Sequence, residues 1–387
     1  MVQARETIPL ARPQIGEREE ELVLEVLRSD RLSLGPMQQR FERAFADYLG
    51  VADAVAVSSG TAALHLGVRA LGWRDGDEVV TSPFSFVAST NCLLYEGVKP
   101  VFCDVDPLTL NIDPAAAWEA IGDDTRGLLP VDILGYPAAM PALEKIAADG
   151  GLGLLQDSCE ALGARDAEDR LVGSRGNLAA FAFYANKQMT TGEGGMLAVS
   201  DPEIAARLRS ERNQGRAPNM GWVDHDRLGF NYRLSEIAAA LGVAQLERLD
   251  QMLADRAAAA VLYGERLSSI GAVADDGELD RLVLPCADVG AERRSWFIYP
   301  VRLPKDADRD RVVETLGQRG VEAKAYMPAI HLMGHVRERF GFEPGQFPIA
   351  EDASRRLLAL PFFPAISEDE IDRVVEALTA ALGGHSG

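Results

Sequence analysis

The residues best suited to chemistry lie around Lys187, where an aromatic, apolar run leads into a glycine-rich turn. This segment, from Phe181 to Met196, has the sequence FAFYANKQMTTGEGGM. Lysine normally stays solvated, and partial burial favours the neutral amine that attacks carbonyl groups to form a Schiff base. The glycines let the backbone approach a bulky ligand closely, and their spacing differs from the GxGxxG fingerprint of dinucleotide-binding sites. The sequence therefore predicts a reactive lysine beside a ligand.

Other segments place polar groups immediately after apolar runs. The segment Ser59–Thr61 begins a predicted helix, whose hydroxyl and free N–H groups suit a phosphate. Asp157 follows a later run, at the sheet edge where open α/β folds bind ligands, and Asn231 precedes another predicted helix. Taken alone, Ser59–Thr61 and Asp157 each fit an ordinary helix cap. A phosphate site, a strand-end Asp and a lysine about thirty residues later together match the requirements of a pyridoxal phosphate (PLP) enzyme.

A sheet must hold these segments together. Short apolar runs without alternation recur through the first half of the chain, which predicts a mostly parallel sheet with helices on both faces. The last two runs flank the glycine-rich turn, so we expect one of them to be antiparallel. The seven runs are Ala54–Val57, Val79–Ser82, Pro100–Cys103, Gly127–Val131, Leu152–Gln156, Ala179–Tyr184 and Met196–Val199.

The pattern changes after residue 234. Ser235 is typical of a helix N-cap, and a long helical stretch runs from it towards Ile270. A βαβ-like tail is expected beyond it, with strand Trp296–Arg302, helix Arg309–Gln318, strand Val321–Tyr326 and a last helix Glu368–Leu382. We expect a large domain from residue 1 to 250 and a smaller α+β domain from 251 to 387.

Composition narrows the class of protein. The 387 residues include 39 basic and 59 acidic side chains, giving a formal net charge of −20. So acidic a surface argues against nucleic-acid partners and anionic membranes. Neither a signal peptide nor a membrane-spanning run is evident, and the four cysteines are scattered, so we expect a cytoplasmic protein with reduced thiols. The one close histidine pair, His331 and His335, lacks the glutamate of an HExxH motif, and no metal site is expected.

Nearly the whole chain resembles the DegT/StrS family of nucleotide-sugar aminotransferases. Segments in the family's order include SSGTAALHL, SPFSFVAST, QDSCEALGA, FYANKQMTTGEGGM and LGFNYRLSEIAAALG. The resemblance implies PLP (PMP in its aminated form) as cofactor. It also implies PLP fold type I, an α/β fold whose large domain holds a mostly parallel seven-stranded sheet between helices, beside a smaller α+β C-terminal domain.

The same resemblance implies the site residues. Lys187 matches the lysine that forms the Schiff base with PLP, and Asp157 matches the acid that pairs with the pyridine nitrogen. Asn231 matches a residue that reaches the phosphate in the neighbouring subunit, so a homodimer with shared active sites is expected. The remaining implied cofactor contacts are Ser59, Gly60 and Thr61 at the phosphate, Phe86 stacked on the ring, and Glu160.

Two positions depart from the family's pattern. Ala182 stands where the family usually has a phosphate-binding serine, which removes one hydrogen bond, a loss of about 1 kcal/mol or somewhat more. Glu160 stands where His or Gln commonly contacts the ring oxygen of PLP. A carboxylate there repels a phenolate-like oxygen unless one of the two carries a proton.

The function implied by the resemblance is transfer of an amino group from L-glutamate to a nucleotide-linked keto-(deoxy)sugar, at C-3 or C-4, by a ping-pong mechanism. Lys187 would act as both nucleophile and general acid/base. Tyr326 and His331 fall in the family's substrate-facing segment of the second domain. The products of the family usually enter polysaccharide or natural-product biosynthesis, and a keto-cyclitol acceptor remains an alternative substrate.

Three other functions fit the sequence less well. PLP-dependent sugar dehydratases of the same family have His at the Schiff-base position, where this chain has Lys187. A non-catalytic regulatory or sensor protein on the same scaffold has no need of both Lys187 and Asp157. A nicotinamide oxidoreductase needs a glycine fingerprint after the first strand, which SSGTAA does not provide. The sequence therefore favours an aminotransferase.

Overall fold

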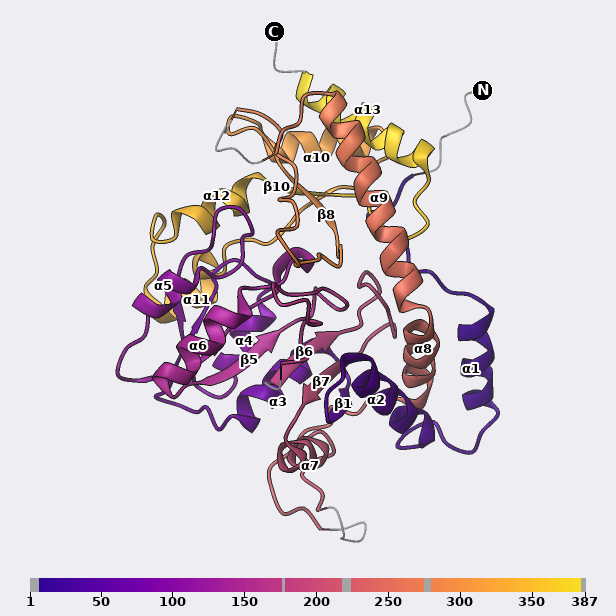
Figure 1. Cartoon of the computed structure of the whole chain (residues 1–387), viewed down its shortest axis with the longest axis vertical. Coiled ribbons are helices and arrows are strands. Elements are labelled where there is room, and N and C mark those ends of the chain that lie inside the picture. The colour runs from indigo at the N-terminus through magenta and orange to yellow at the C-terminus, as the bar shows by residue number, and fades with distance from the viewer. Residues whose placement is uncertain (1–6, 176–177, 218–223, 275–279, 384–387) are drawn as a thin grey trace.

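The larger of two sheets forms the centre of the molecule. The computed structural model describes residues 7–175, 178–217, 224–274 and 280–383 (Figure 1). Seven strands form this sheet in the order β1-β7-β6-β5-β4-β2-β3. They are β1 (Asp53–Val57), β2 (Glu78–Thr81), β3 (Lys99–Phe102), β4 (Thr125–Leu129), β5 (Gly153–Asp157), β6 (Leu178–Ala182) and β7 (Gly195–Val199).

Strand direction confirms the predicted sheet. β3, β2, β4, β5 and β6 pair in parallel, whereas β7 pairs antiparallel with both β6 and β1. The mostly parallel order and the antiparallel strand after the glycine-rich turn are as expected. Because two antiparallel pairings separate β1 from β6, these two strands and β5 point the same way and end at one edge.

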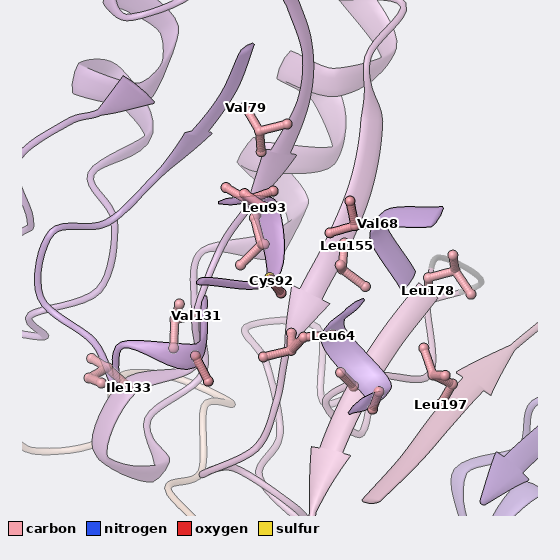
Figure 2. Close-up of a cluster of buried hydrophobic side chains, with 14 of the residues drawn as sticks. Leu64, Val68, Val79, Cys92, Leu93, Val131, Ile133, Leu155, Leu178 and Leu197 are labelled. Atoms are coloured by element: carbon pink, nitrogen blue, oxygen red, sulfur yellow. The ribbon is translucent and has the colours of Figure 1, made fainter. Parts of the chain in front are cut away.

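Helices cover both faces because alternate strand residues point to opposite sides. Val55 and Leu178 pack with α3 (Gly60–Ala70), α4 (Ala88–Leu94) and α7 (Pro202–Glu211). Figure 2 shows part of this cluster, which includes Leu64 of α3 and Leu155 of β5.

Ala54 and Phe181 point to the opposite face of the sheet and pack against other helices. The helices of this face are α1 (Glu17–Leu27), α2 (Pro36–Leu49), α5 (Pro114–Glu119), α6 (Met140–Gly150) and α8 (Glu236–Glu247).

A second, smaller sheet lies beyond α9 (Leu249–Ser269), which runs from the large sheet to it (Figure 1). Its order is β8-β10-β9 and its pairings are antiparallel. The strands and their helices are β8 (Tyr299–Arg302), α10 (Arg309–Gln318), β9 (Lys324–Ala325), α11 (Gly334–Phe340), α12 (Pro348–Arg356), β10 (Leu357–Leu360) and α13 (Glu368–Gly383).

The prediction for this second region was partly wrong. Helices α10 and α13 lie where expected, but the strand expected at Val321–Tyr326 is reduced to two residues. β10 was not predicted, and it lies between β8 and β9, so the two strands of the expected βαβ tail are not neighbours. The described residues contain no helix that is long and apolar enough to cross a bilayer.

The long helix expected from Ser235 to Ile270 is two helices. Ser235 does cap α8, since its hydroxyl accepts a hydrogen bond from the N–H of Ala238 at 3.2 Å. Arg248 then leaves the helical conformation (φ −115°, ψ 2°), and its guanidinium lies 3.1 Å from the buried carboxylate of Glu19. We propose the domain boundary near residue 250, because α9 begins at this break and packs Tyr263 and Leu267 on the small sheet.

Close packing of α8 on α2 gives a prediction for stability. A Cβ on Gly242 would come within 2.6 Å of the Phe41 ring, which is itself held by Phe45 and Phe183. Gly242→Ala should therefore lower the free energy of unfolding by about 1–3 kcal/mol, measured by chemical denaturation.

Gly264→Ala on α9 is the matched control, since the nearest atom to its new Cβ is the Tyr299 hydroxyl at 3.8 Å. This substitution should stabilise the protein by up to about 1 kcal/mol, because alanine favours helix over glycine. Equal effects at the two positions would contradict the packing argument.

Candidate active site

A cavity of about 380 Å³ opens where β1, β5 and β6 end. Its walls come from the loops after these strands, from the start of α4 and from a loop of the C-terminal region. Of the ten predicted site residues, eight line this cavity, whereas Asn231 and His331 lie outside its lining. The eight are Ser59, Gly60, Thr61, Phe86, Asp157, Glu160, Lys187 and Tyr326.

The first wall is the N-terminus of α3. Ser59 caps this helix by accepting a hydrogen bond from the N–H of Ala62 at 3.1 Å, which leaves the N–H groups of Gly60 and Thr61 in the first helical turn. A Cβ on Gly60 would come within 2.6 Å of the Ala182 side chain. Only glycine fits there, and Ala182 lies beside the helix start, where the missing serine hydroxyl was expected.

Asp157 ends β5 and is 4% exposed. One carboxylate oxygen accepts a hydrogen bond from the Ser89 hydroxyl at 2.7 Å, and the other accepts one from the N–H of Cys159 at 3.1 Å. Ser89 in turn lies 2.7 Å from the Ser85 hydroxyl, and both serines line the cavity. Each carboxylate oxygen has two lone pairs, so Asp157 retains acceptor capacity towards the cavity. Sequence reasoning missed both serines.

Lys187 lies in the loop between β6 and β7, with a side chain that is 13% exposed. Its Nζ is 3.5 Å from Oε1 of Glu160 and 3.9 Å from the centroid of the Phe297 ring. Phe297 is 1% exposed, and its position 110 residues further along the chain gave no sequence signal of a role beside the lysine.

Arg256 of α9 holds the backbone around the lysine. One guanidinium nitrogen donates to the carbonyl of Lys187 at 3.2 Å, and another donates to the carbonyl of Phe297 at 3.2 Å. Arg256 is buried, and this burial lowers its pKa to about 10. Its guanidinium therefore fixes the lysine relative to the ring beneath its amine. The residue lies in an alanine-rich helix whose pattern predicts packing, not a site.

Glu160 carries the unexpected carboxylate of the site. Its Oε2 accepts a hydrogen bond from the N–H of Leu134 at 3.0 Å, and Leu134 adopts a left-handed conformation (φ 57°) that is uncommon for leucine. Burial raises the pKa of Glu160, and the charge of Asp157 raises it further, while Lys187 opposes both effects. A proton on Glu160 would remove the repulsion expected between this carboxylate and a phenolate-like oxygen.

The aromatic residues of the cavity differ in exposure. Phe86 is 62% exposed at the cavity wall, whereas Tyr326 is partly buried with its ring edge-on to Phe297. Burial raises the pKa of Tyr326, so its hydroxyl keeps its proton at neutral pH. Asn231 is exposed on the loop before α8.

His331 does not reach the cavity. It is fully buried, lies 3.1 Å from the carboxylate of Glu351 and packs its ring against Phe347. Apolar packing thus places this histidine in the interior of the C-terminal region, so the predicted sugar contact of His331 has no support in the structure. Among the described residues, no group of three or more His, Cys, Asp or Glu side chains is arranged to hold a metal ion.

The arrangement of these groups fits PLP. A lysine amine for a Schiff base, a carboxylate with spare acceptor capacity for a ring nitrogen, and a helix N-terminus for a phosphate line a single cavity. The helix start is crowded enough to exclude any side chain at Gly60. Lys187, Asp157 and the segment Ser59–Thr61 would hold the cofactor.

Comparisons with known proteins point the same way. Residues 13–379 match the model of the DegT/DnrJ/EryC1/StrS aminotransferase family. The chain is 35% identical to GDP-perosamine synthase of Caulobacter vibrioides, over 97% of this chain and 98% of that protein. It is 34% identical to the spore coat polysaccharide biosynthesis protein SpsC of Bacillus subtilis, over 99% of this chain and 100% of that protein. The structure is similar to that of DesV of S. venezuelae in complex with a ketimine intermediate. The TM-score is 0.85 and the identity is 33%, over 94% of this chain and 93% of that chain.

A buried acid behind the cavity leads to a prediction for pH dependence. Asp132 is fully buried and accepts hydrogen bonds from the Ser158 hydroxyl at 2.8 Å, the Gln156 amide at 2.9 Å and the N–H of Ala138 at 2.8 Å. Burial nevertheless raises the pKa of Asp132 to about 7. The folded protein therefore binds this proton more tightly than the unfolded chain does, and the resulting stabilisation is lost as pH rises through about 7.

Asp132→Asn removes this titration. The free energy of unfolding of the variant relative to the parent should therefore increase between about pH 5 and about pH 8, measured by urea denaturation at each pH. The effect of the amide on the free energy of unfolding at any one pH does not decide the test, because the test follows how the difference between variant and parent changes with pH. A difference that stays constant with pH would show that Asp132 does not titrate as described.

Ala182 gives a prediction for cofactor affinity. Ala182→Ser would place a hydroxyl beside the N-terminus of α3, and one added hydrogen bond to a phosphate should tighten PLP binding about fivefold or more. Titration of the cofactor-free protein with PLP, followed by visible absorbance, measures the change. Ala185→Ser, in the loop that follows β6 but absent from the cavity lining, is the control and should leave the affinity unchanged.

Proposed function

Because the chain belongs to the DegT/DnrJ/EryC1/StrS aminotransferase family, we propose that it moves an amino group from L-glutamate to a nucleotide-linked keto-(deoxy)sugar, at C-3 or C-4, by a ping-pong mechanism. Proteins of this family are PLP-dependent aminotransferases, and the family includes sugar aminotransferases. The observation that carries the proposal is the presence of Lys187 and Asp157 in one cavity beside the N-terminus of α3. The proposed compartment is the cytoplasm, as the sequence predicts.

Each residue in the proposal has a task. PLP, when bound, supplies an electron sink for the carbanion left by proton removal. Lys187 would act as the nucleophile that holds the cofactor and as the base that moves a proton at the substrate carbon, since it lines the cavity. Asp157 would accept a hydrogen bond from the cofactor's ring nitrogen and favour its protonated form. The N–H groups at Ser59–Thr61 would bind the phosphate, and Phe86 would pack on the ring.

The acceptor is proposed from the relatives and the cavity. The similarity to GDP-perosamine synthase makes a GDP-linked keto-sugar the first acceptor to test, and the similarity to SpsC supports a role in polysaccharide biosynthesis. Tyr326 lines the cavity from a loop of the C-terminal region, and its protonated hydroxyl is suited to bind a sugar hydroxyl. We retain Tyr326 and leave out His331 as a substrate contact.

The proposal includes a homodimer with shared active sites. Asn231 is exposed and lies outside the cavity of its own chain, which supports a contact with the cofactor of a second copy. The backbone around it is firmly held, because the carbonyl of Tyr232 accepts a hydrogen bond from the N–H of Ser58 at 2.8 Å. The phosphate loop of one chain thereby supports the residue proposed to reach the other.

The amino-donor half-reaction tests the proposal directly. Purified protein should show a visible absorbance band from bound PLP, and L-glutamate should bleach it with formation of 2-oxoglutarate. Lys187→Ala should abolish the band shift and the exchange, because no amine remains to move the proton. Lys145→Ala, at an exposed lysine of α6, is the control.

Near-UV circular dichroism of Lys187→Ala would show that the fold is retained. A band that ignores glutamate in the unmodified protein would contradict the donor half of the proposal. Exchange that survives in Lys187→Ala would contradict the role of the lysine.

A further inference from the structure

Two groups from distant parts of the chain meet at the amine of Lys187. The carboxylate of Glu160, three residues after the end of β5, lies 3.5 Å from Nζ, and the ring of Phe297, just before β8, lies 3.9 Å below it. Glu160 is 5% exposed and Phe297 is 1% exposed. The amine therefore contacts a charge and an aromatic face that are both shielded from water.

Both groups are fixed in place. The Phe297 ring packs edge-on against Tyr326, with 5.9 Å between centroids, and its carbonyl shares the Arg256 guanidinium with the carbonyl of Lys187. Glu160 is held by the N–H of Leu134, whose left-handed backbone directs that N–H at the carboxylate. A left-handed leucine is energetically costly, and such a cost at the residue that holds Glu160 points to a functional constraint on this carboxylate.

An amine that works as nucleophile and base must exist free of the cofactor for part of each cycle, and must then gain and lose a proton. A desolvated aromatic face stabilises an ammonium, and a neighbouring carboxylate can take its proton. Asp157 is less suited to this exchange, because each of its oxygens already accepts a hydrogen bond, from Ser89 or Cys159, and its remaining acceptor capacity is assigned to the ring nitrogen. In Glu160 the bond from Leu134 occupies Oε2 and leaves Oε1 beside Nζ.

We propose that Phe297 and Glu160 form a holding site for the free amine of Lys187. Phe297 is a positioning residue that retains the ammonium at the cavity wall. Glu160 exchanges a proton with it: an N–H bond of the ammonium breaks, an O–H bond forms at Oε1, and the neutral amine is released for chemistry. The reverse step restores the ion pair, so no other reactant is consumed.

Opposing influences act on the pKa of Glu160: burial and the charge of Asp157 raise it, and the charge of Lys187 lowers it. The charged or titratable groups that act on it are Lys187 from the β6–β7 loop, Asp157 and Cys159 from its own segment, and Tyr326 from the C-terminal region. The N–H of Leu134 faces its second oxygen. This holding site rests on the proposed function, because it assigns the amine chemistry to Lys187.

Chemical labelling of full-length, cofactor-free protein tests the holding site without any turnover. Acetic anhydride reacts with neutral amines, so the extent of Lys187 acetylation at a single pH near 8, read by peptide mass spectrometry, reports how well the ammonium is held. Lys145, whose side chain is 75% exposed on α6, serves as the internal standard.

Two replacements address the two groups. Pentafluorophenylalanine introduced at position 297 keeps the ring's approximate size but reverses its quadrupole, and Glu160→Gln removes the charge at constant shape. Each should raise the labelling of Lys187 relative to Lys145 about fivefold or more, because each destabilises the ammonium. Glu193→Gln, at another carboxylate of the cavity wall, should leave the ratio unchanged.

Far-UV circular dichroism and the thermal midpoint of each variant establish that it is folded. An unchanged labelling ratio in the folded fluorinated protein would overturn the role of Phe297, and an unchanged ratio in folded Glu160→Gln would overturn the role of Glu160. Neither result bears on glutamate exchange, and a protein that fails to transaminate can still show the labelling changes. The holding site and the proposed function are thus tested separately.

Discussion

The cavity depends on the shared direction of β1, β5 and β6. Because these strands point the same way, segments about a hundred and about thirty residues apart in the sequence meet at one edge of the sheet. The antiparallel β7 then returns from this edge alongside β1, and a Cβ on Gly195 would lie 2.4 Å from the carbonyl of Ser59. The glycines after Lys187 therefore serve the close approach of two strands as well as the space for a ligand.

Charge is concentrated in the same small volume. A chain with a net charge of −20 places the carboxyl groups of Asp157, Glu160 and Asp132 in or behind one cavity, where a low dielectric strengthens their interaction. Burial raises the pKa of Glu160 and Asp132, and the charge of Asp157 adds to both effects. Asp157 differs from them in facing the cavity with two donors behind it. The amine of Lys187 and the N-terminus of α3 supply the opposing positive potential.

Sequence patterns were sufficient for those parts of the molecule that local chemistry decides. All seven strands of the large sheet, the Ser235 cap and the cavity positions of Ser59–Thr61, Asp157 and Lys187 follow from apolar runs, caps and motifs. The break at Arg248 escaped prediction because it has no local signal such as an adjacent proline or glycine, and the contact of Arg248 with Glu19 found there is tertiary.

Long-range packing accounts for the other differences. β10 is only four residues long, and it becomes a strand by insertion between β8 and β9. Phe297 and Arg256 reach Lys187 through the fold of the C-terminal region, and His331 is turned away by its packing with Phe347. Three hydrogen bonds hold the backbone of the lysine loop. The Arg256 guanidinium donates to the carbonyl of Lys187, the N–H of Lys187 donates to the carbonyl of Tyr184, and the Gln188 amide donates to the carbonyl of Ser295. None of these bonds uses the side chain at position 187. Scaffold and reactive group are thus separable, and a different side chain at position 187 would meet the same loop backbone in the same place.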